Sequence, residues 1–334
     1  MKHSFKIINT GINNPDIVVA MLAYNHSKYI VKAIDSVLLQ ETSFTYKIII
    51  AEDCSTDSTR KIILNYQRKF PDKFKLILQN KNVGASQNNL DLLKNMDGKY
   101  IAALECDDYW IDPLKLQKQV EFLDKNKEYS MVFTPAFRKY ESSNKSNVVR
   151  NRYFNYNSDD FLLENILMLG GGFYPTCSAM FLNKIFDVNN SMEYLKIHST
   201  GDYPIAILAA IKGKIGYIDD VTSVYRVQDN SVSNKLFKIC EDCIKDVKIK
   251  YEKNIKFLNF LFNEIKINKK LERELLSKEN YILLSKYLNC GHYSGFSNLF
   301  FKLNLSIKHR LKIIAKIIYL LIIGNKQSKI QKGS

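Results

Sequence analysis

The amino-acid sequence predicts an α/β fold in which a mostly parallel central sheet is flanked by helices and followed by a C-terminal helical extension. Over the first 135 residues, short continuous apolar runs alternate with segments whose apolar residues have helical spacing. From residue 235 onward the spacing stays helical and lysine is frequent. Because crossovers that contain a helix join parallel strands, we expect helices on both faces of the sheet.

Polar residues follow three of the strands expected in this first region. The strands are expected at residues 16–23, 46–51, 75–78, 100–104 and 131–137, and the helices at residues 27–40, 55–68, 85–95 and 113–124. The polar residues are Tyr24-Asn25, Glu52-Asp53 and Glu105 to Asp108. Ligands of parallel sheets bind at the carboxyl ends of the strands, so a ligand site is predicted at this edge.

The segment after residue 137 is less regular. Residues 138–158 are polar and are expected to form a loop, and residues 170–178 form a glycine-rich loop. Further helices are expected at residues 159–169 and from residues 199–204 to about 212, with strands at residues 179–182, 214–218 and 221–227. We therefore place one domain at residues 1–234 and a basic helical region at residues 235–334.

Most of the positive charge belongs to the C-terminal region. The formal net charge is +15, and residues 235–334 carry 21 basic and 8 acidic side chains. No acidic residue occurs from residue 281 onward. Such a surface suits either a nucleic acid or an anionic membrane face.

Residues 305–323 are predicted to form an amphipathic helix. One helical face carries Ile307, Leu311, Ile314, Ile318 and Leu321, whereas the basic residues lie mostly elsewhere on the helix. Its most apolar part, residues 313–323, is eleven residues long, but a bilayer span takes about twenty apolar residues. We expect the helix to lie in a membrane interface; the alternative is that it packs on its own domain.

Glu105, Asp107 and Asp108 concentrate like charge directly after an apolar strand. Two unit charges about 5 Å apart repel by roughly 3 kcal/mol in an effective dielectric of about 20. Proton uptake, a neighbouring basic side chain or a divalent cation would relieve this repulsion. Carboxylate oxygens are the ligands that Mg²⁺ and Mn²⁺ prefer, and a solvated loop is the alternative reading.

These acidic residues begin a resemblance that covers about residues 15–235. Residues 105–119 resemble the acidic metal motif of family-2 glycosyltransferases, which are inverting, nucleotide-sugar-dependent enzymes with the Rossmann-like GT-A fold. Other segments that resemble family motifs, in the same order, are residues 19–25, 48–59, 80–89, 201–204 and 224–233. The resemblance implies a nucleotide-sugar-binding half at residues 15–135 and an acceptor half at residues 136–234.

The resemblance also implies roles in donor binding. Asp53 would accept the imide N–H of a uracil or thymine base, and Ala23, Tyr24 and Asn25 would line the base. Asn82 and Gly84 would shape the ribose side. For these positions the structural alternatives are a helix cap at Asp53, a core position for Tyr24 and a plain turn at residues 82–84.

Further implied roles concern the cation, the diphosphate and the acceptor. Asp107 and Asp108 would contact the ribose and hold Mg²⁺ or Mn²⁺ on the diphosphate, with Glu105 as an additional candidate ligand. Asp202 would be the general base, with helix capping as its alternative. Arg226 would pair with the diphosphate, or else with a carboxylate such as that of Asp219 or Asp220.

Three positions depart from the common family pattern. Gln228 stands where many members carry His, Glu105 replaces the commoner Asp, and Cys54 replaces a frequent Gly.

The sequence therefore favours a glycosyltransferase of the bacterial surface-polysaccharide type. The expected donor is a UDP-sugar, and the expected acceptor is a hydroxyl group of a lipid-linked oligosaccharide or a surface polysaccharide. Scattered cysteines and an N-terminus without an apolar signal segment predict a cytoplasmic protein, bound peripherally to the inner face of the cell membrane through the basic helix. The alternatives are a basic nucleic-acid-binding protein, for which no recognition motif is present, and an inactive scaffold with the same fold.

Overall fold

The computed structural model describes residues 4–142, 146–149, 161–187, 191–198, 201–228, 242–290 and 292–331. The chain divides into two units, residues 1–231 and residues 232–334. The sequence-based boundary at residue 234 falls between residues 229 and 241, which lie outside the described residues.

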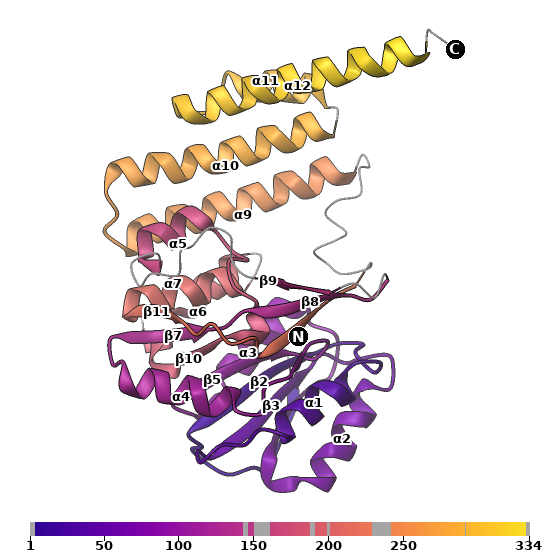
Figure 1. The fold of residues 1–334 in the computed structure, drawn as a ribbon, viewed down its shortest axis with the longest axis vertical. Helices are drawn as coiled ribbons and strands as arrows, with labels where there is room; N and C mark the ends of the chain where they lie inside the picture. The colour runs from indigo at the N-terminus through magenta and orange to yellow at the C-terminus, as the bar shows by residue number, and fades with distance from the viewer. Residues whose placement is uncertain are drawn as a thin grey trace. The chain divides into compact units, whose positions relative to one another are not determined.

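An eight-stranded sheet forms the centre of the N-terminal unit (Figure 1). Its order is β1 (Phe5–Asn9), β4 (Phe74–Gln79), β3 (Tyr46–Glu52), β2 (Ile17–Ala23), β5 (Tyr100–Glu105), β10 (Met180–Leu182), β7 (Tyr129–Phe133) and β11 (Lys214–Tyr217). The strands β4, β3, β2 and β5 are mutually parallel, as are β7 and β11, whereas β1 and β10 run antiparallel to their neighbours. The predicted mostly parallel sheet is therefore confirmed.

Helices cover both faces of this sheet. The helices of the unit are α1 (Ile30–Leu38), α2 (Thr59–Lys69), α3 (Ala85–Leu93), α4 (Lys115–Lys125), α5 (Leu163–Leu169), α6 (Ser191–Ile197) and α7 (Asp202–Lys212). Alternate strand residues such as Val19, Met21 and Ile48 form one core with α1, α2 and α4. The helix α3 packs against β2 and β3 from the other side. Each fully buried Val or Ile side chain stabilises the fold by about 1.5–3 kcal/mol.

A second sheet replaces part of the loop expected at residues 138–158. Its order is β6 (Tyr109–Trp110), β12 (Ser223–Val227), β8 (Ala136–Tyr140) and β9 (Ser146–Val149). The expected strand 131–137 is thus two strands, because β7 ends at Phe133 and β8 begins at Ala136. The loop prediction was wrong for residues 138–140 of β8 and for β9, because these strands are held by backbone pairing that a local apolar pattern does not record.

The C-terminal unit is helical, as predicted. It contains α9 (Asp242–Glu264), α10 (Lys269–Asn289), α11 (Tyr293–Phe300) and α12 (Ile307–Gln331). The helix α10 packs against each of the other three, and its Leu284 and Leu288 form a core with Leu305 and with Ile313 of α12. Within the described residues, every helix is too short or too polar to span a bilayer.

Lys115 is a cation buried between α4 and the second sheet. Its Nζ donates to Gln119 Oε1 at 2.6 Å and lies 4.4 Å from the centroid of the Trp110 ring. Gln119 Nε2 donates in turn to the carbonyl of Ser178 at 2.8 Å. Burial lowers the pKa of Lys115 to about 7 because the protein interior disfavours the charged form.

We predict that Lys115→Met flattens the dependence of stability on pH. The unfolded side chain keeps a pKa of about 10.5 and the folded one has a pKa of about 7, so the unfolded state binds more protons between these values. The free energy of unfolding of the natural chain should therefore rise with pH across this window. The variant should lose up to about 5 kcal/mol of that rise, which urea titrations at several pH values would measure.

Lys118→Met on the same helix is the matched control. Lys118 is partly exposed and pairs with Asp112 and Asp220 at 2.8 Å each. Equal pH slopes for the natural chain and Lys115→Met would contradict the prediction.

Candidate active site

The three polar strand ends predicted from the sequence lie side by side. The strands β3, β2 and β5 are adjacent and parallel, so Asp53, Tyr24 and Asp107 follow neighbouring strand ends at one edge of the sheet. The turns after β2 and β3 contain left-handed residues, Asn25 and Cys54, each with a φ of 55°. This backbone conformation favours glycine, which gives a physical reason for the frequent glycine at the Cys54 position.

Asp53 fixes the loop that leads into α3. Its buried carboxylate accepts hydrogen bonds from the backbone N–H groups of Val83 at 2.7 Å and Gly84 at 2.9 Å. Gly84 has a φ of 84°, which suits glycine, and Asn82 beside it is exposed. The helix-cap alternative for Asp53 is wrong, because α2 begins at Thr59 and both Asp53 oxygens bond the loop. The helix expected from residue 55 begins at Thr59, so Ser55 lies before it.

Asn25 joins the turns after β2 and β3. Its Oδ1 accepts from the Thr56 N–H at 2.8 Å, and its own N–H donates to Ser55 Oγ at 3.0 Å. Ala23 is buried beneath these turns, whereas the Tyr24 side chain is 42% exposed. The core alternative for Tyr24 is therefore wrong.

Glu105, Asp107 and Asp108 occupy different environments. Asp108 is buried and its Oδ1 accepts from the Arg226 N–H at 2.7 Å, whereas Asp107 is half-buried and its Oδ2 accepts from Gln228 Nε2 at 2.9 Å. Glu105 Oε2 and Asp108 Oδ2 are buried without a hydrogen-bond partner among the described residues. The cluster is therefore only partly compensated by the protein.

Burial and mutual repulsion raise two of the three carboxyl pKa values. Burial first, and then the charge of Asp107, raise the pKa of Glu105 to about 7. Burial and the charge of Glu105 raise the pKa of Asp108 well above its ordinary value. A nearby cation would also stabilise these carboxyl groups, because a bound proton and a cation each relieve the repulsion between the negative charges.

The Arg226 side chain supports the acidic turn from β12. Its guanidinium donates to the backbone carbonyl of Asp107 and pairs with Glu141, with Nε 3.2 Å from Oε1. It also lies over the Tyr109 ring, 4.6 Å from the centroid. The sequence-based alternative that Arg226 pairs with a carboxylate is thus confirmed, with Glu141 as the partner. Asp220 pairs with Lys118, and the Tyr217 hydroxyl donates to Asp219.

Asp202 begins α7 and is held by the glycine-rich loop. Its Oδ2 accepts from the Gly172 N–H at 2.7 Å, and its backbone carbonyl accepts from the Tyr174 hydroxyl at 2.9 Å. Gly172 has a φ of 78°, and a Cβ on Gly171 would lie 3.1 Å from the same carboxylate oxygen. The Asp202 carboxylate thus bonds the loop, and α7 has no side-chain cap hydrogen bond at Gly201. The charge of Asp202 also contributes to the raised pKa of Glu105, so the two carboxyl groups lie within electrostatic reach of each other.

Sequence reasoning missed the residues that connect these parts. Trp110 Nε1 donates to the carbonyl of Cys177 at 2.8 Å and thereby fastens the loop that holds Asp202 to the acidic turn. His26 Nδ1 is buried without a hydrogen-bond partner in the described part of the chain. Burial lowers the pKa of His26, although the negative charges of Asp107 and Asp57 act to raise it. In the sequence, only the position of His26 directly after Tyr24-Asn25 indicated that this side chain lies near the candidate site.

The donor set of the acidic turn fits a cation that also binds phosphate. Among the described residues, no group of three or more His, Cys, Asp or Glu side chains forms a complete metal cage. Mg²⁺ and Mn²⁺ in phosphate sites usually need only one or two carboxylates, because the substrate supplies other oxygens. The half-buried carboxylate of Asp107, beside two buried oxygens without partners, meets that requirement.

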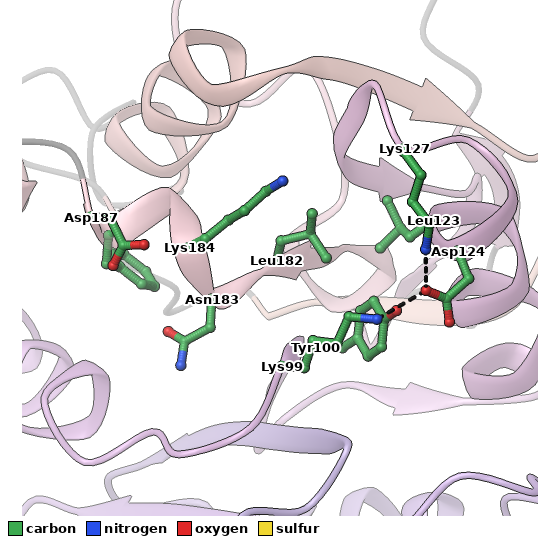
Figure 2. Close-up of a pocket in the computed structure, with 10 residues that line it drawn as sticks. Lys99, Tyr100, Leu123, Asp124, Lys127, Leu182, Asn183, Lys184 and Asp187 are labelled. Carbon is green, nitrogen blue, oxygen red and sulfur yellow. Dashed lines mark hydrogen bonds and ion pairs between the residues drawn. The ribbon is translucent and has the colours of Figure 1, made fainter.

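A cavity of about 500 Å³ lies at the other end of β5, away from the acidic turn (Figure 2). Its lysines are partly neutralised, because Asp124 Oδ1 pairs with Lys99 at 2.9 Å and with Lys127 at 2.7 Å. Tyr100, the first residue of β5, also lines it. None of the predicted site residues lines this cavity, so it is separate from the candidate site.

Comparison with known families identifies the class of protein. Residues 18–188, more than half of the chain, match the family described as Glycosyl transferase family 2, and the chain belongs to this family. The family-2 membership that the sequence motifs predicted is therefore confirmed.

Several relatives match over about a third of the chain. An uncharacterized protein of Mycobacterium tuberculosis is 42% identical over 127 residues, 38% of this chain and 37% of that protein. EpsE of Bacillus subtilis, named as a glycosyltransferase, is 36% identical over 38% of this chain and 44% of EpsE. TuaG of Bacillus subtilis, whose name assigns it to teichuronic acid biosynthesis, is 36% identical over 33% of this chain and 42% of TuaG. The chain thus spans less than half the length of these relatives.

Solved structures share the fold at low sequence identity. S. aureus TarS 1-349 in complex with UDP-GlcNAc has a TM-score of 0.57 and 16% identity, covering 90% of this chain and 79% of TarS 1-349. Mannosyltransferase PcManGT from Pyrobaculum calidifontis, in complex with GDP-Man and Mn²⁺, has a TM-score of 0.54 and 13% identity, covering 95% and 84%. These likenesses support the GT-A type of fold.

We predict that Asp53 and Asp202 each protect the backbone amides of one loop. In Asp53→Ala, hydrogen exchange at the Val83 and Gly84 amides should accelerate by at least about tenfold, because hydrogen bonds to a carboxylate are lost. In Asp202→Ala, the Gly172 amide should accelerate instead. Each variant serves as the control for the other, and acceleration of both loops in either variant would contradict the assignment.

Proposed function

We propose that this chain is an inverting glycosyltransferase that moves a sugar from a nucleotide-sugar donor, expected to be a UDP-sugar, to a hydroxyl group of a lipid-linked oligosaccharide or a surface polysaccharide. The observation that carries the proposal is the grouping of Asp53, Asp107 and Asp202 around the carboxyl edge of one sheet, each held differently. Three carboxylates in different environments suit three tasks: base recognition, cation binding and proton removal.

Asp53 is proposed to recognise the nucleotide base. Its two oxygens each accept one backbone N–H, and a carboxylate has about four acceptor positions, so it can also accept the imide N–H of uracil. Tyr24, Ala23 and Asn25 follow the neighbouring strand end and would line the base. Asn82 and Gly84 belong to the loop that Asp53 fixes, which supports a ribose contact there.

Asp107 rather than Asp108 is proposed as the direct ligand of Mg²⁺ or Mn²⁺. Asp108 is buried and bonded to the backbone of Arg226, whereas Asp107 is half-buried and can be reached from solvent. The pKa of Glu105, about 7, leaves that carboxyl partly protonated near neutral pH and makes it the weaker candidate. A bound cation would offset charge that develops on the departing nucleoside diphosphate. The PcManGT complex, which contains GDP-Man and Mn²⁺, supports this role by analogy of fold.

Asp202 is proposed to remove the proton from the acceptor hydroxyl as its oxygen attacks the anomeric carbon. The Gly172 N–H fixes the carboxylate orientation, and the nearby Glu105 belongs to the acidic turn that would face the donor. A base on the side opposite the leaving diphosphate inverts the configuration at that carbon. Arg226 would then act mainly by holding the Asp107 backbone, with diphosphate contact as an additional role.

The proposal also concerns the place of action and the acceptor. The names of EpsE and TuaG, as a glycosyltransferase and a teichuronic acid biosynthesis glycosyltransferase, support a polysaccharide acceptor. Such acceptors are made at membranes, so we propose that the chain works at the inner face of the cell membrane. Nucleic acid is a poorer partner for the N-terminal unit because its open edge is acidic.

We predict that Asp202→Asn abolishes transfer but preserves donor binding. The amide keeps the acceptor oxygen for Gly172 but cannot take up a proton, so the transfer rate should fall at least about a thousandfold. UDP affinity, measured by calorimetry, should stay within about threefold. Loss of UDP binding in a folded variant would contradict the assignment of Asp202 as the base.

We predict that Asp107→Asn removes the effect of Mn²⁺ on UDP binding, whereas Asp108→Asn keeps it. Because Asp107 is the reachable carboxylate, the natural chain should bind UDP at least about tenfold more tightly with Mn²⁺ than with excess chelator. Asp108→Asn retains the acceptor for the Arg226 N–H and is the matched control. The reverse pattern would make Asp108 the direct ligand.

A further inference from the structure

The helix α12 has two apolar faces, and the C-terminal unit covers only one of them. Ile313 is fully buried, and Ile317 packs against the same core as Leu284 of α10. His309 lies on this covered face, where its Nδ1 hydrogen-bonds Ser277 Oγ at 2.7 Å. These contacts fasten α12 to α10 through side chains at positions 309, 313 and 317.

The second apolar face of α12 is exposed. Its four residues are Ile307, Leu311, Ile314 and Ile318, with 79%, 61%, 46% and 52% of their surface exposed. Their spacing of four, three and four residues gives a stripe along one side of the helix. Phe301, just before α12, is the most exposed large apolar side chain of the described residues, at 85%. The covered and exposed faces are therefore distinct sets of residues.

Basic side chains border the exposed stripe. At 100° per residue, Lys308 and Arg310 flank the stripe on its two sides, with Arg310 toward the covered face. Lys312 lies farther round the helix beyond Lys308, and Lys316 lies on the side opposite the stripe. Acidic residues are absent from residue 281 to the end of the sequence. The stripe thus combines apolar surface with a single sign of charge.

We propose that this stripe, defined as Ile307, Leu311, Ile314 and Ile318, docks into an anionic lipid surface while α12 stays packed on α10. An anionic lipid layer satisfies both parts of the surface, because acyl chains receive the apolar stripe and headgroups pair with the lysines. A nucleic acid would use the charge but bury little of the stripe. A second copy would bring like charges together along the same face.

The proposal deepens the membrane association proposed above and rests on it, but not on the chemistry of transfer. It adds that the docking face is already formed in the folded C-terminal unit, since the residues that fasten the helix differ from those that would insert. Substitutions in the stripe should therefore leave folding intact, whereas Ile313→Asp should destabilise the unit.

Sedimentation of the full-length chain with lipid vesicles tests the proposal. We expect binding to vesicles of phosphatidylcholine with about three tenths phosphatidylglycerol, and at least about tenfold weaker binding to phosphatidylcholine alone. The double variant Leu311→Gln, Ile314→Gln keeps the net charge and should bind the anionic vesicles at least about tenfold more weakly. Leu39→Gln is the control, because Leu39 is an exposed leucine of the N-terminal unit, at 71%.

The charge is tested separately with Lys308→Gln, Lys312→Gln. Each lysine near an anionic surface strengthens binding by about fivefold, so this variant should lose roughly 25-fold and become less sensitive to salt. Circular dichroism of every variant checks folding, and hydrolysis of UDP-sugars measured in parallel reports on the proposed activity.

Four results would overturn the proposal. The first two are unchanged vesicle binding in the stripe variant and equal binding to both lipid compositions. The third is tighter binding of the natural chain to a DNA duplex than to anionic vesicles at physiological salt. The fourth is a dimer that the stripe substitutions abolish, with no vesicle binding by the natural chain. Because UDP-sugar hydrolysis is followed in the same samples, failure of lipid binding with intact hydrolysis separates this proposal from the proposed transfer reaction.

Discussion

Repulsion among carboxylates at one edge of the sheet is the constraint on which the rest of the N-terminal unit depends. The strands β3, β2 and β5 end side by side, and the segments that follow bring their acids together. The protein offsets part of this charge with backbone N–H groups rather than with lysine. The backbone N–H groups of Val83 and Gly84 donate to Asp53. Those of Gly172 and Arg226 donate to Asp202 and Asp108, respectively. Each acid therefore organises a distant loop.

This use of backbone donors explains where glycine is required. At Gly84 and Gly172 the chain adopts a positive φ so that its N–H points at a carboxylate. These hydrogen bonds attach each loop to an acidic residue with a proposed role. The loop at Gly84 is bonded to Asp53, and the loop at Gly172 is bonded to Asp202. Glu105 Oε2 and Asp108 Oδ2 remain uncompensated, so an added cation beside them would relieve the most repulsion.

The second sheet supplies side chains that contact the acidic turn. It brings Arg226 and Gln228 onto the acidic turn through β12, although these residues lie more than a hundred positions away in the sequence. Trp110 on β6 then ties the turn to the loop around Cys177. The C-terminal unit, in contrast, concentrates positive charge and an apolar stripe on a helix that is already packed.

The sequence by itself determined the parallel sheet and the identity of the acidic residues. Buried parallel strands have continuous apolar sequences, so the strands can be recognised directly. The polar residues that follow each run mark the strand ends. Only the tertiary structure decided that Glu141 is the partner of Arg226, that Asp108 is buried while Asp107 is reachable, and that residues 146–149 form a strand. It also separated the covered and exposed faces of α12. The physical reason is that burial, long-range ion pairs and backbone pairing depend on which segments meet in space, and local apolar patterns do not record that.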